Sequence, residues 1–195
     1  MIHFKTPDME NNYLQSVINQ FEYYKVLGEK TFEQIAEEKL MWQYNDESNS
    51  IATIVKHLYG NMLSRWTDFL STDGEKEWRN RDSEFENDLT AKDQIINMWN
   101  QGWNVFLTTL NSLHAEDLAK TIYIRNQGHT VMEAINRQLA HYSYHVGQIV
   151  FIGKMCSENW SSLSIPKGNS KEFNKEKFSK PLHQEHFTDD VLKKK

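Results

Sequence analysis

The stretch TVMEAINRQLAHYSYHVGQIVFIGKMCS, residues 130–157, has the pattern of one long amphipathic helix. It opens with Thr130 and Glu133, which have the spacing of a capping box, a motif that satisfies two free backbone N–H groups at a helix start. The apolar residues that follow recur at three- and four-residue steps: Val131, Ile135, Leu139, Tyr142, Val146 and Ile149. The stretch therefore predicts a helix from Thr130 to about Ser157 with one buried face.

Two histidines, His141 and His145, lie four residues apart in this helix. That spacing places both imidazoles on one face, one turn apart, which suits two ligands of a single metal ion. They fall on the margin of the apolar stripe, where a side chain in a bundle is half-buried and can face a cavity. The chain has eight histidines, so a pair at this spacing also arises readily by chance, and the pair alone does not establish a metal site.

Three further segments have helical periodicity. They run from Asn11 to Leu40, from about Ser50 through Phe69, and from just after Thr90, whose hydroxyl can cap the helix, through Leu110. Before the last helix, the stretch AKTIYIRNQGHTV predicts a short β-hairpin, because β-branched and aromatic residues flank a turn-forming centre. Four amphipathic helices in one modest chain predict an all-α four-helix bundle.

The length of 195 residues suits one domain, which we expect to span residues 1–178. From Trp160 onward Gly, Ser and Lys replace the apolar periodicity, which predicts an extended or partly disordered segment. Residues 179–195 should form a polar, Lys-rich and flexible tail. The lysines of the C-terminal segment could dock a partner or an anionic surface, although most such runs are only solvated. They are Lys171, Lys175, Lys177, Lys180 and the terminal Lys193 to Lys195.

Composition and the absence of certain motifs argue against several classes of function and location. The net charge is −5, with 27 acidic residues against 22 basic ones, which argues against a nucleic-acid partner. One cysteine, Cys156, cannot form an intramolecular disulfide, and neither a signal peptide nor a long apolar window is evident, so we expect a cytoplasmic protein that neither is secreted nor spans a membrane. Neither G-x-G-x-x-G nor G-x-x-x-x-G-K-[ST] occurs, which excludes nucleotide hydrolysis by those routes.

A third histidine, His57, flanks the apolar stripe of the second predicted helix. If it meets His141 and His145, three neutral imidazoles would hold a divalent ion and leave at least one position open, as in catalytic sites. Such an ion can lower the pKa of a bound water to roughly 7 or polarise a substrate atom. A lone histidine is more often a hydrogen-bonded, partly buried residue, so both interpretations stay open at this point.

Arginines provide candidate substrate contacts. In EWRNRDSEF, residues 77–85, Arg79 and Arg81 could hold a carboxylate or phosphate beside the metal. We prefer the alternative that they form ion pairs at the surface with the acidic residues nearby, Asp82, Glu84 and Glu86. Asn61 and Arg65, one turn apart on the second helix, are comparable candidates for substrate binding.

The three histidines also carry a family resemblance. His57 lies within IATIVKHLYGNMLSRWTDFL, and His141 and His145 lie within AHYSYHVGQIVFIGK, followed by Gly147 and Gln148. In these residues the sequence resembles the DinB-like superfamily of bacterial four-helix-bundle metalloproteins. Its members pair a histidine of the second helix with an H-x-x-x-H in the last long helix, often followed by Gly-Gln. Residues 61–86 and the stretch SLSIPKGNSKEFN look like one branch of it, a domain of unknown function.

This resemblance covers about residues 10–178 and implies a DinB-like bundle of up-down-down-up order with a long connection, often a homodimer. It implies the three histidines as ligands of one divalent ion, which could be Zn, Ni, Fe or Mn. Better-understood relatives include thiol-dependent transferases and isomerases. We therefore expect a metal-dependent hydrolase or thiol S-transferase acting on an unidentified small molecule. The alternative is a non-catalytic dimeric ligand-binding or structural bundle whose metal site is structural or vestigial.

Four of the tryptophans lie at helical positions. We predict that they lie in the core or in a dimer interface: Trp42, Trp66, Trp99 and Trp103.

Overall fold

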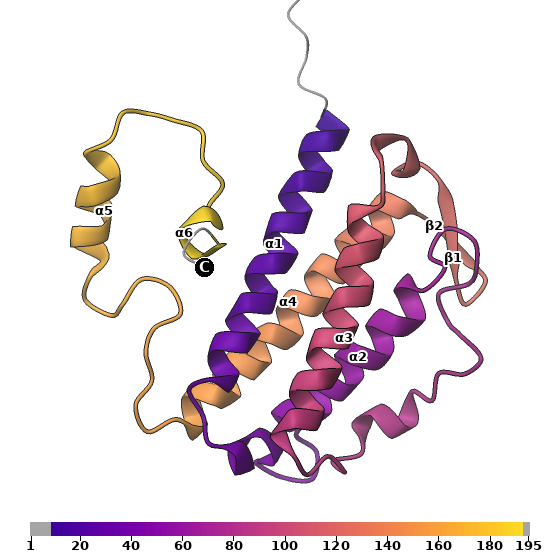
Figure 1. Ribbon diagram of the computed structural model, residues 1–195, viewed down its shortest axis with the longest axis horizontal. Helices are drawn as coiled ribbons and strands as arrows, with labels where there is room; N and C mark the ends of the chain where they lie inside the picture. Colours follow the sequence, from indigo (N-terminus) through magenta and orange to yellow (C-terminus); the bar gives the residue numbers. More distant parts are fainter. Residues whose placement is uncertain (1–8, 193–195) are drawn as a thin grey trace, which may run out of the picture.

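Four long helices pack side by side in the computed structural model, which describes residues 9–192. As Figure 1 shows, the first and last of them run in one direction and the middle two in the other, which is the predicted up-down-down-up order. The connection 67–91 returns along the length of the bundle, so that the middle two helices are parallel. The helices are α1 (Met9–Phe32), α2 (Ile51–Trp66), α3 (Lys92–Asn111) and α4 (Val131–Cys156). The prediction of an all-α bundle is confirmed.

The start of α4 follows the predicted capping box. The Thr130 hydroxyl accepts a hydrogen bond from the Glu133 N–H at 3.1 Å, and the Glu133 carboxylate accepts one from the Thr130 N–H at 2.7 Å. The predicted hairpin precedes it, with β1 (Thr121–Ile124) antiparallel to β2 (Gln127–Thr130). Its two-residue turn has positive φ at Arg125 (55°) and Asn126 (60°), as a turn of the type I′ class requires. Gln127 and Gly128 therefore belong to the second strand.

The first helix ends earlier than its apolar pattern predicts. It stops at Phe32, and after an extended Ala36 the chain forms a separate 3₁₀ helix, Glu37–Met41. Leu40 of this short helix is fully buried, so the apolar spacing continues through tertiary packing although the backbone turns away from the helix axis. The prediction of one helix from Asn11 to Leu40 is therefore wrong in its second half.

Helix α2 begins as predicted but also ends early. Ser50 caps it by accepting a hydrogen bond from the Thr53 N–H at 3.0 Å. The helix stops at Trp66 because Thr67, its C-cap, has extended backbone angles, with a ψ of 127°. Asp68 then adopts a positive φ of 50°, which turns the chain away from the helix axis. Phe69, the last apolar residue of the sequence pattern, still packs against the Trp66 ring at 4.4 Å between centroids.

The predicted cap of α3 is wrong. The residue before the helix is Ala91, whose side chain offers no cap, and the Thr90 hydroxyl takes no part. The Lys92 N–H instead donates to the carboxylate of Glu37 at 3.0 Å. This partner lies 55 residues away in the sequence, so the free N–H at the helix start is satisfied by a distant element.

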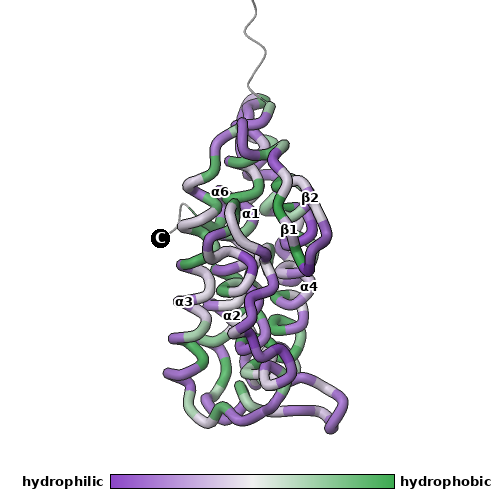
Figure 2. The backbone as a smooth tube through the Cα atoms, turned by 90° about the vertical axis from the view of Figure 1, so that its right-hand side faces the viewer, coloured by the Kyte–Doolittle hydropathy of each residue, from purple (hydrophilic) through white to green (hydrophobic). Residues whose placement is uncertain are grey.

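Aromatic side chains fill the core. The centroid of the Phe106 ring lies 4.5 Å from that of Phe21, 4.6 Å from that of Trp66 and 5.2 Å from that of Tyr142. Trp66, Trp99 and Trp103 are buried, whereas Trp42 is only half-buried. In Figure 2, hydrophobic and hydrophilic segments alternate along the helices, as expected when each helix buries one face.

The segment after Trp160 is not wholly extended, which corrects that expectation. It contains α5 (Ser170–Phe178) and the short α6 (Asp189–Leu192). The second of these lies against α1. Just before it, His186 Nε2 is 3.2 Å from the Ser16 hydroxyl, and the Phe187 ring contacts the Tyr23 ring. A domain boundary at residue 178 stays a prediction, and Lys193 to Lys195 lie outside the described residues.

Within residues 9–192, no helix combines the length and the apolar character needed to cross a lipid bilayer.

Candidate metal centre

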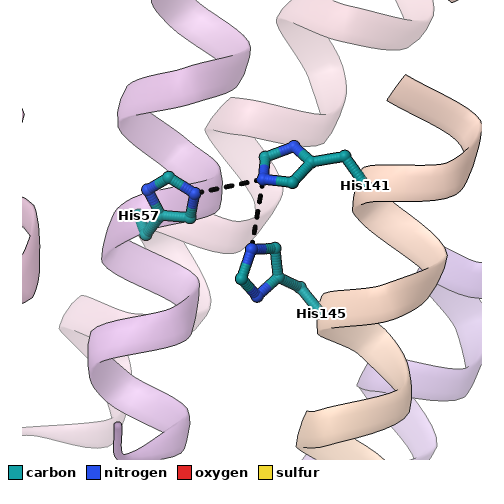
Figure 3. Close-up of side chains that lie close together, drawn as sticks. All are labelled: His57, His141 and His145. Carbon is teal, nitrogen blue, oxygen red and sulfur yellow. Dashed lines mark hydrogen bonds between the residues drawn. The ribbon is translucent and has the colours of Figure 1, made fainter. Parts of the chain in front are cut away.

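Three imidazoles converge between α2 and α4. His57 comes from α2, and His141 and His145 come from successive turns of α4, so that all three rings face one another (Figure 3). The Nε2 atom of His141 lies 3.2 Å from Nε2 of His57 and 3.1 Å from Nε2 of His145. One ring nitrogen from each histidine lies within 4.8 Å of the other two. The three predicted ligands are therefore brought together.

The other ring nitrogen of each histidine faces a side-chain oxygen. The pairs are His57 Nδ1 with Glu84 Oε2 at 2.9 Å, His141 Nδ1 with Gln138 Oε1 at 3.2 Å, and His145 Nδ1 with Gln148 Oε1 at 2.8 Å. Because each oxygen accepts, each Nδ1 carries the hydrogen, and a neutral ring then has its lone pair on Nε2. This pattern of outer hydrogen bonds is typical of histidines that ligate a metal.

The donor set fits a divalent cation. Three Nε2 lone pairs that face one another repel unless a cation lies between them. Burial, together with the neighbouring imidazoles, lowers the pKa of His141 to about 3, and burial lowers the pKa of His145 to about 4. Both rings are therefore neutral at pH 7, which is the state that binds a metal. The three imidazoles suit Zn, Ni or Fe, and they suit Mn less well because Mn prefers oxygen ligands.

His57 is buried more deeply than its place on the helix predicts. The sequence predicts a half-buried residue, but His57 is only 5% exposed. The cover comes from the 3₁₀ helix Asp82–Phe85, whose Phe85 ring stacks on the imidazole at 4.9 Å and whose Glu84 bonds Nδ1. His141 and His145 are half-buried, as predicted.

Glu84 joins the metal centre to Arg79. Its carboxylate accepts two hydrogen bonds from the Arg79 guanidinium, from Nε at 2.7 Å and from Nη2 at 2.9 Å. Burial acts to raise the pKa of Glu84, but the hydrogen bonds from His57 and Arg79 leave that pKa below its ordinary value. The sequence favoured an ion pair at the surface between Arg79 and a nearby acidic residue. Glu84 is one of the predicted partners, but the pair is buried, since the Arg79 side chain is only 2% exposed.

A glycine allows this carboxylate to approach α2. A Cβ added at Gly60 would lie 2.2 Å from Glu84 Oε1, which is far inside the contact distance of the two atoms. Any other residue at this position would therefore move the Glu84 side chain away from the helix.

A cavity of about 410 Å³ opens beside the three histidines. It is lined by all four side chains that the sequence offered as substrate contacts, Asn61, Arg65, Arg79 and Arg81. Phe85 and Gln138 also line it, together with two arginines that the sequence analysis did not single out, Arg125 and Arg137. The cavity has the size of a small-molecule site. Substrate binding by these residues stays a prediction.

Some of the missed residues had a sequence signal and others did not. Gln138 lies three residues before His141, and Gln148 lies three residues after His145, so helical spacing alone places each beside its ring. Arg137 lies one turn before His141 and could have been found in the same way. Glu84 and Arg125 come from a connection and a hairpin turn, where no periodicity relates them to the helices.

Comparison with known proteins adds a family and no activity. The sequence model of a family described as "Protein of unknown function (DUF1572)" matches residues 8–169. That range contains the three histidines and every residue that lines the cavity beside them. No curated protein matches the chain.

Proposed function

Since the chain belongs to the DUF1572 family of proteins of unknown function, we propose its activity from the site itself: a metal-dependent enzyme with one divalent ion on His57, His141 and His145. The observation that carries the proposal is the convergence of three Nε2 atoms whose Nδ1 atoms are all engaged by oxygens. The same three positions support the finer proposal of a DinB-like bundle.

The proposed chemistry is hydrolysis or thiol S-transfer. When bound, a divalent ion with three imidazole ligands supplies an open coordination position, where it lowers the pKa of a water to roughly 7 or polarises a substrate oxygen or sulfur. Glu84 and the two glutamines hold the rings in the orientation and tautomer that the ion needs. Phe85 shields His57 from solvent, and the cavity walls would orient the substrate.

One observation favours the alternative, a non-catalytic dimeric ligand-binding or structural bundle. Among the described residues that line the cavity, none is a carboxylate, a lysine or a tyrosine that could act as a general base. Glu84, the nearest carboxylate, is engaged by His57 and Arg79. A catalytic reaction here would therefore depend on the ion alone to activate water or a thiol.

The remaining expectations are part of this proposal. They are a homodimer, a single domain over residues 1–178 with a flexible tail, a cytoplasmic location and a small-molecule substrate. Light scattering would test the first of these, because a monomer has a mass of 23.1 kDa. A mass near that value at micromolar concentration would contradict the homodimer.

Metal content tests the proposal most directly. Elemental analysis of untagged protein should find close to one divalent ion per chain, and H57A, H141A and H145A should each lose it. The control is H114A, which removes an exposed histidine. If wild-type protein binds no metal after incubation with Zn, Ni, Fe and Mn, or if the three variants keep it, the proposed site is wrong.

Activity separates the enzyme from the alternative. The loaded protein would be assayed against panels of esters, amides and thiol conjugates, with metal-free protein as the control. Turnover that requires both metal and His57 supports the enzyme. A stoichiometric metal without any turnover supports the ligand-binding alternative.

A further inference from the structure

The arginines of this chain are distributed in an unusual way. The sequence has 22 basic residues, of which five are arginines. All five line the cavity beside the three histidines, although they come from α2, the connection, the hairpin turn and α4. None of the lysines in the described part of the chain lines it. The residue type therefore matters here, and not only the positive charge.

Three of these arginines are fixed by carboxylates. One oxygen of Glu75 lies 3.0 Å from Arg65 Nη1, 3.4 Å from Arg79 Nη1 and 3.2 Å from Arg125 Nη2. Arg79 is also held by both oxygens of Glu84. The three guanidiniums therefore form one side of the cavity, and their charge is already largely balanced by Glu75 and Glu84.

The other two, Arg81 and Arg137, have no such partner. Within residues 9–192, no carboxylate lies within ion-pair distance of either one. Arg81 lies over the Phe85 ring, with 4.9 Å from its guanidinium carbon to the ring centroid, and Arg137 lies one turn before His141 on α4. Five guanidiniums against two carboxylates leave an excess of three positive charges, in a chain whose net charge is −5. A cavity of this sign attracts anions.

The uncharged groups of the cavity also present hydrogen-bond donors. The Trp66 indole N–H, which can only donate, bonds the Tyr142 oxygen at 3.1 Å, so the Tyr142 hydroxyl donates to Asn61 Oδ1 at 3.0 Å. This leaves the Asn61 amide hydrogens for the cavity. The Gln138 oxygen is likewise taken by His141, which leaves the Gln138 amide hydrogens. The lining therefore suits a ligand that is rich in acceptors.

We propose that this cavity binds a small molecule through an anionic oxygen group, a phosphate or a pair of carboxylates, with Arg81 and Arg137 as its direct contacts. A guanidinium binds such groups through two parallel N–H bonds, which an ammonium cannot do, and this explains the choice of arginine. Arg65, Arg79 and Arg125, which are paired with carboxylates, form the cavity wall beside these contacts. The inference deepens the proposed function by naming the substrate class, but the anion site itself needs no metal.

The test is titration calorimetry with two simple probes, inorganic phosphate and malonate, on metal-free protein from which the chelator has been removed by gel filtration. Wild type would be compared with R81Q, R137Q and the double variant. The control is K154Q, which removes one exposed positive charge from the same helix at a position outside the cavity. Circular dichroism melts would establish that each variant is folded.

We expect each arginine variant to bind roughly 10- to 100-fold more weakly than wild type, because each loses a charged two-point contact. K154Q should bind as wild type does. R137K keeps the charge but loses the pair of parallel N–H donors. Its affinity for the anion should lie between those of wild type and R137Q. The tighter of the two probes identifies the phosphate or the dicarboxylate as the source chemistry.

Two results would overturn the inference: no binding of either probe to wild type at millimolar concentration, or equal binding by wild type and the double variant. Neither depends on the metal. If wild type binds the anion but no metal, the proposed enzyme is wrong and the anion site stands. If it binds metal but no anion, the anion site is wrong and the proposed metal site stands.

Discussion

Glu84 Oε2 lies 2.9 Å from His57 Nδ1, although 27 residues separate the two in the sequence. The pair joins a helix that supplies a candidate metal ligand to a connection that would otherwise only link α2 to α3. A carboxylate in this position fixes the tautomer of the ring and raises its basicity as a ligand. The strength of the metal site should therefore depend on a residue that does not touch the metal.

We first predict that E84Q weakens zinc binding by about 10- to 100-fold, the usual effect of removing such an outer partner. The amide keeps the shape of the carboxylate but loses its charge, and it leaves the guanidinium of Arg79 without its strongest acceptor. Competition with a chelating dye would measure the affinity. E86Q, a neighbouring exposed carboxylate, is the control, and equal affinities in the two variants would contradict the prediction.

Zinc should also stabilise the fold. A ligand at about 100 times its Kd that binds only the folded state adds roughly 2.7 kcal/mol, which raises the melting temperature of a domain of this size by about 5–10 °C. Differential scanning calorimetry with zinc and then with excess chelator would measure the shift. The shift should vanish in H145A, and its persistence there would place the zinc at another site.

A third prediction concerns Gly60. G60A puts a methyl group 2.2 Å from the present position of Glu84 Oε1, so the carboxylate must withdraw from the helix and from His57. Zinc affinity should fall about as far as in E84Q. The matched control is G147A, because a Cβ at Gly147 meets nothing within 4 Å. That variant should keep its zinc affinity and gain about 0.5–1 kcal/mol of stability from better helix propensity. Unchanged zinc affinity in G60A would count against the role of Glu84.

The buried Tyr142 hydroxyl should matter for stability. Y142F would leave the Trp66 indole N–H and Asn61 Oδ1 without their partner in the core, at a cost of roughly 1–3 kcal/mol in the free energy of unfolding. Urea denaturation would measure it. Y144F makes the same change two residues along at a 63% exposed side chain, and should stay within about 0.5 kcal/mol of wild type. Equal stability of the two variants would show that the hydroxyl adds nothing.

The sequence predicts most of the helical framework because helix signals are local. A capping box places the start of α4, Ser50 caps α2, and apolar spacing identifies each buried face. The same local reasoning places His141 and His145 on one face of α4. It overextends α1 and α2, because Leu40 and Phe69 continue the apolar spacing after the backbone has left the helix.

What the sequence does not predict depends on contacts between distant segments. Glu37 caps α3 across 55 residues, and Glu84 reaches His57 from a segment without periodicity. The same cause explains the error over Arg79, since nothing near it in the sequence indicates that a connection folds over a helix face and buries it. The convergence of five arginines is likewise visible only once the hairpin, the connection and two helices are in place.

The candidate metal ligands lie on helices, whereas several residues of the cavity and their carboxylate partners lie on a connection, and this arrangement affects how the ligand preference of such a protein can change. The candidate ligands lie on α2 and α4, whose packing the whole core depends on, whereas Glu75, Arg79, Arg81 and Glu84 lie on residues 67–91, outside the bundle helices. Replacing that one segment would alter the charge and shape of the cavity without disturbing the two ligands of α4. A common scaffold could in this way acquire new ligand preferences, and chimeras that exchange only this segment offer a practical route to engineering them.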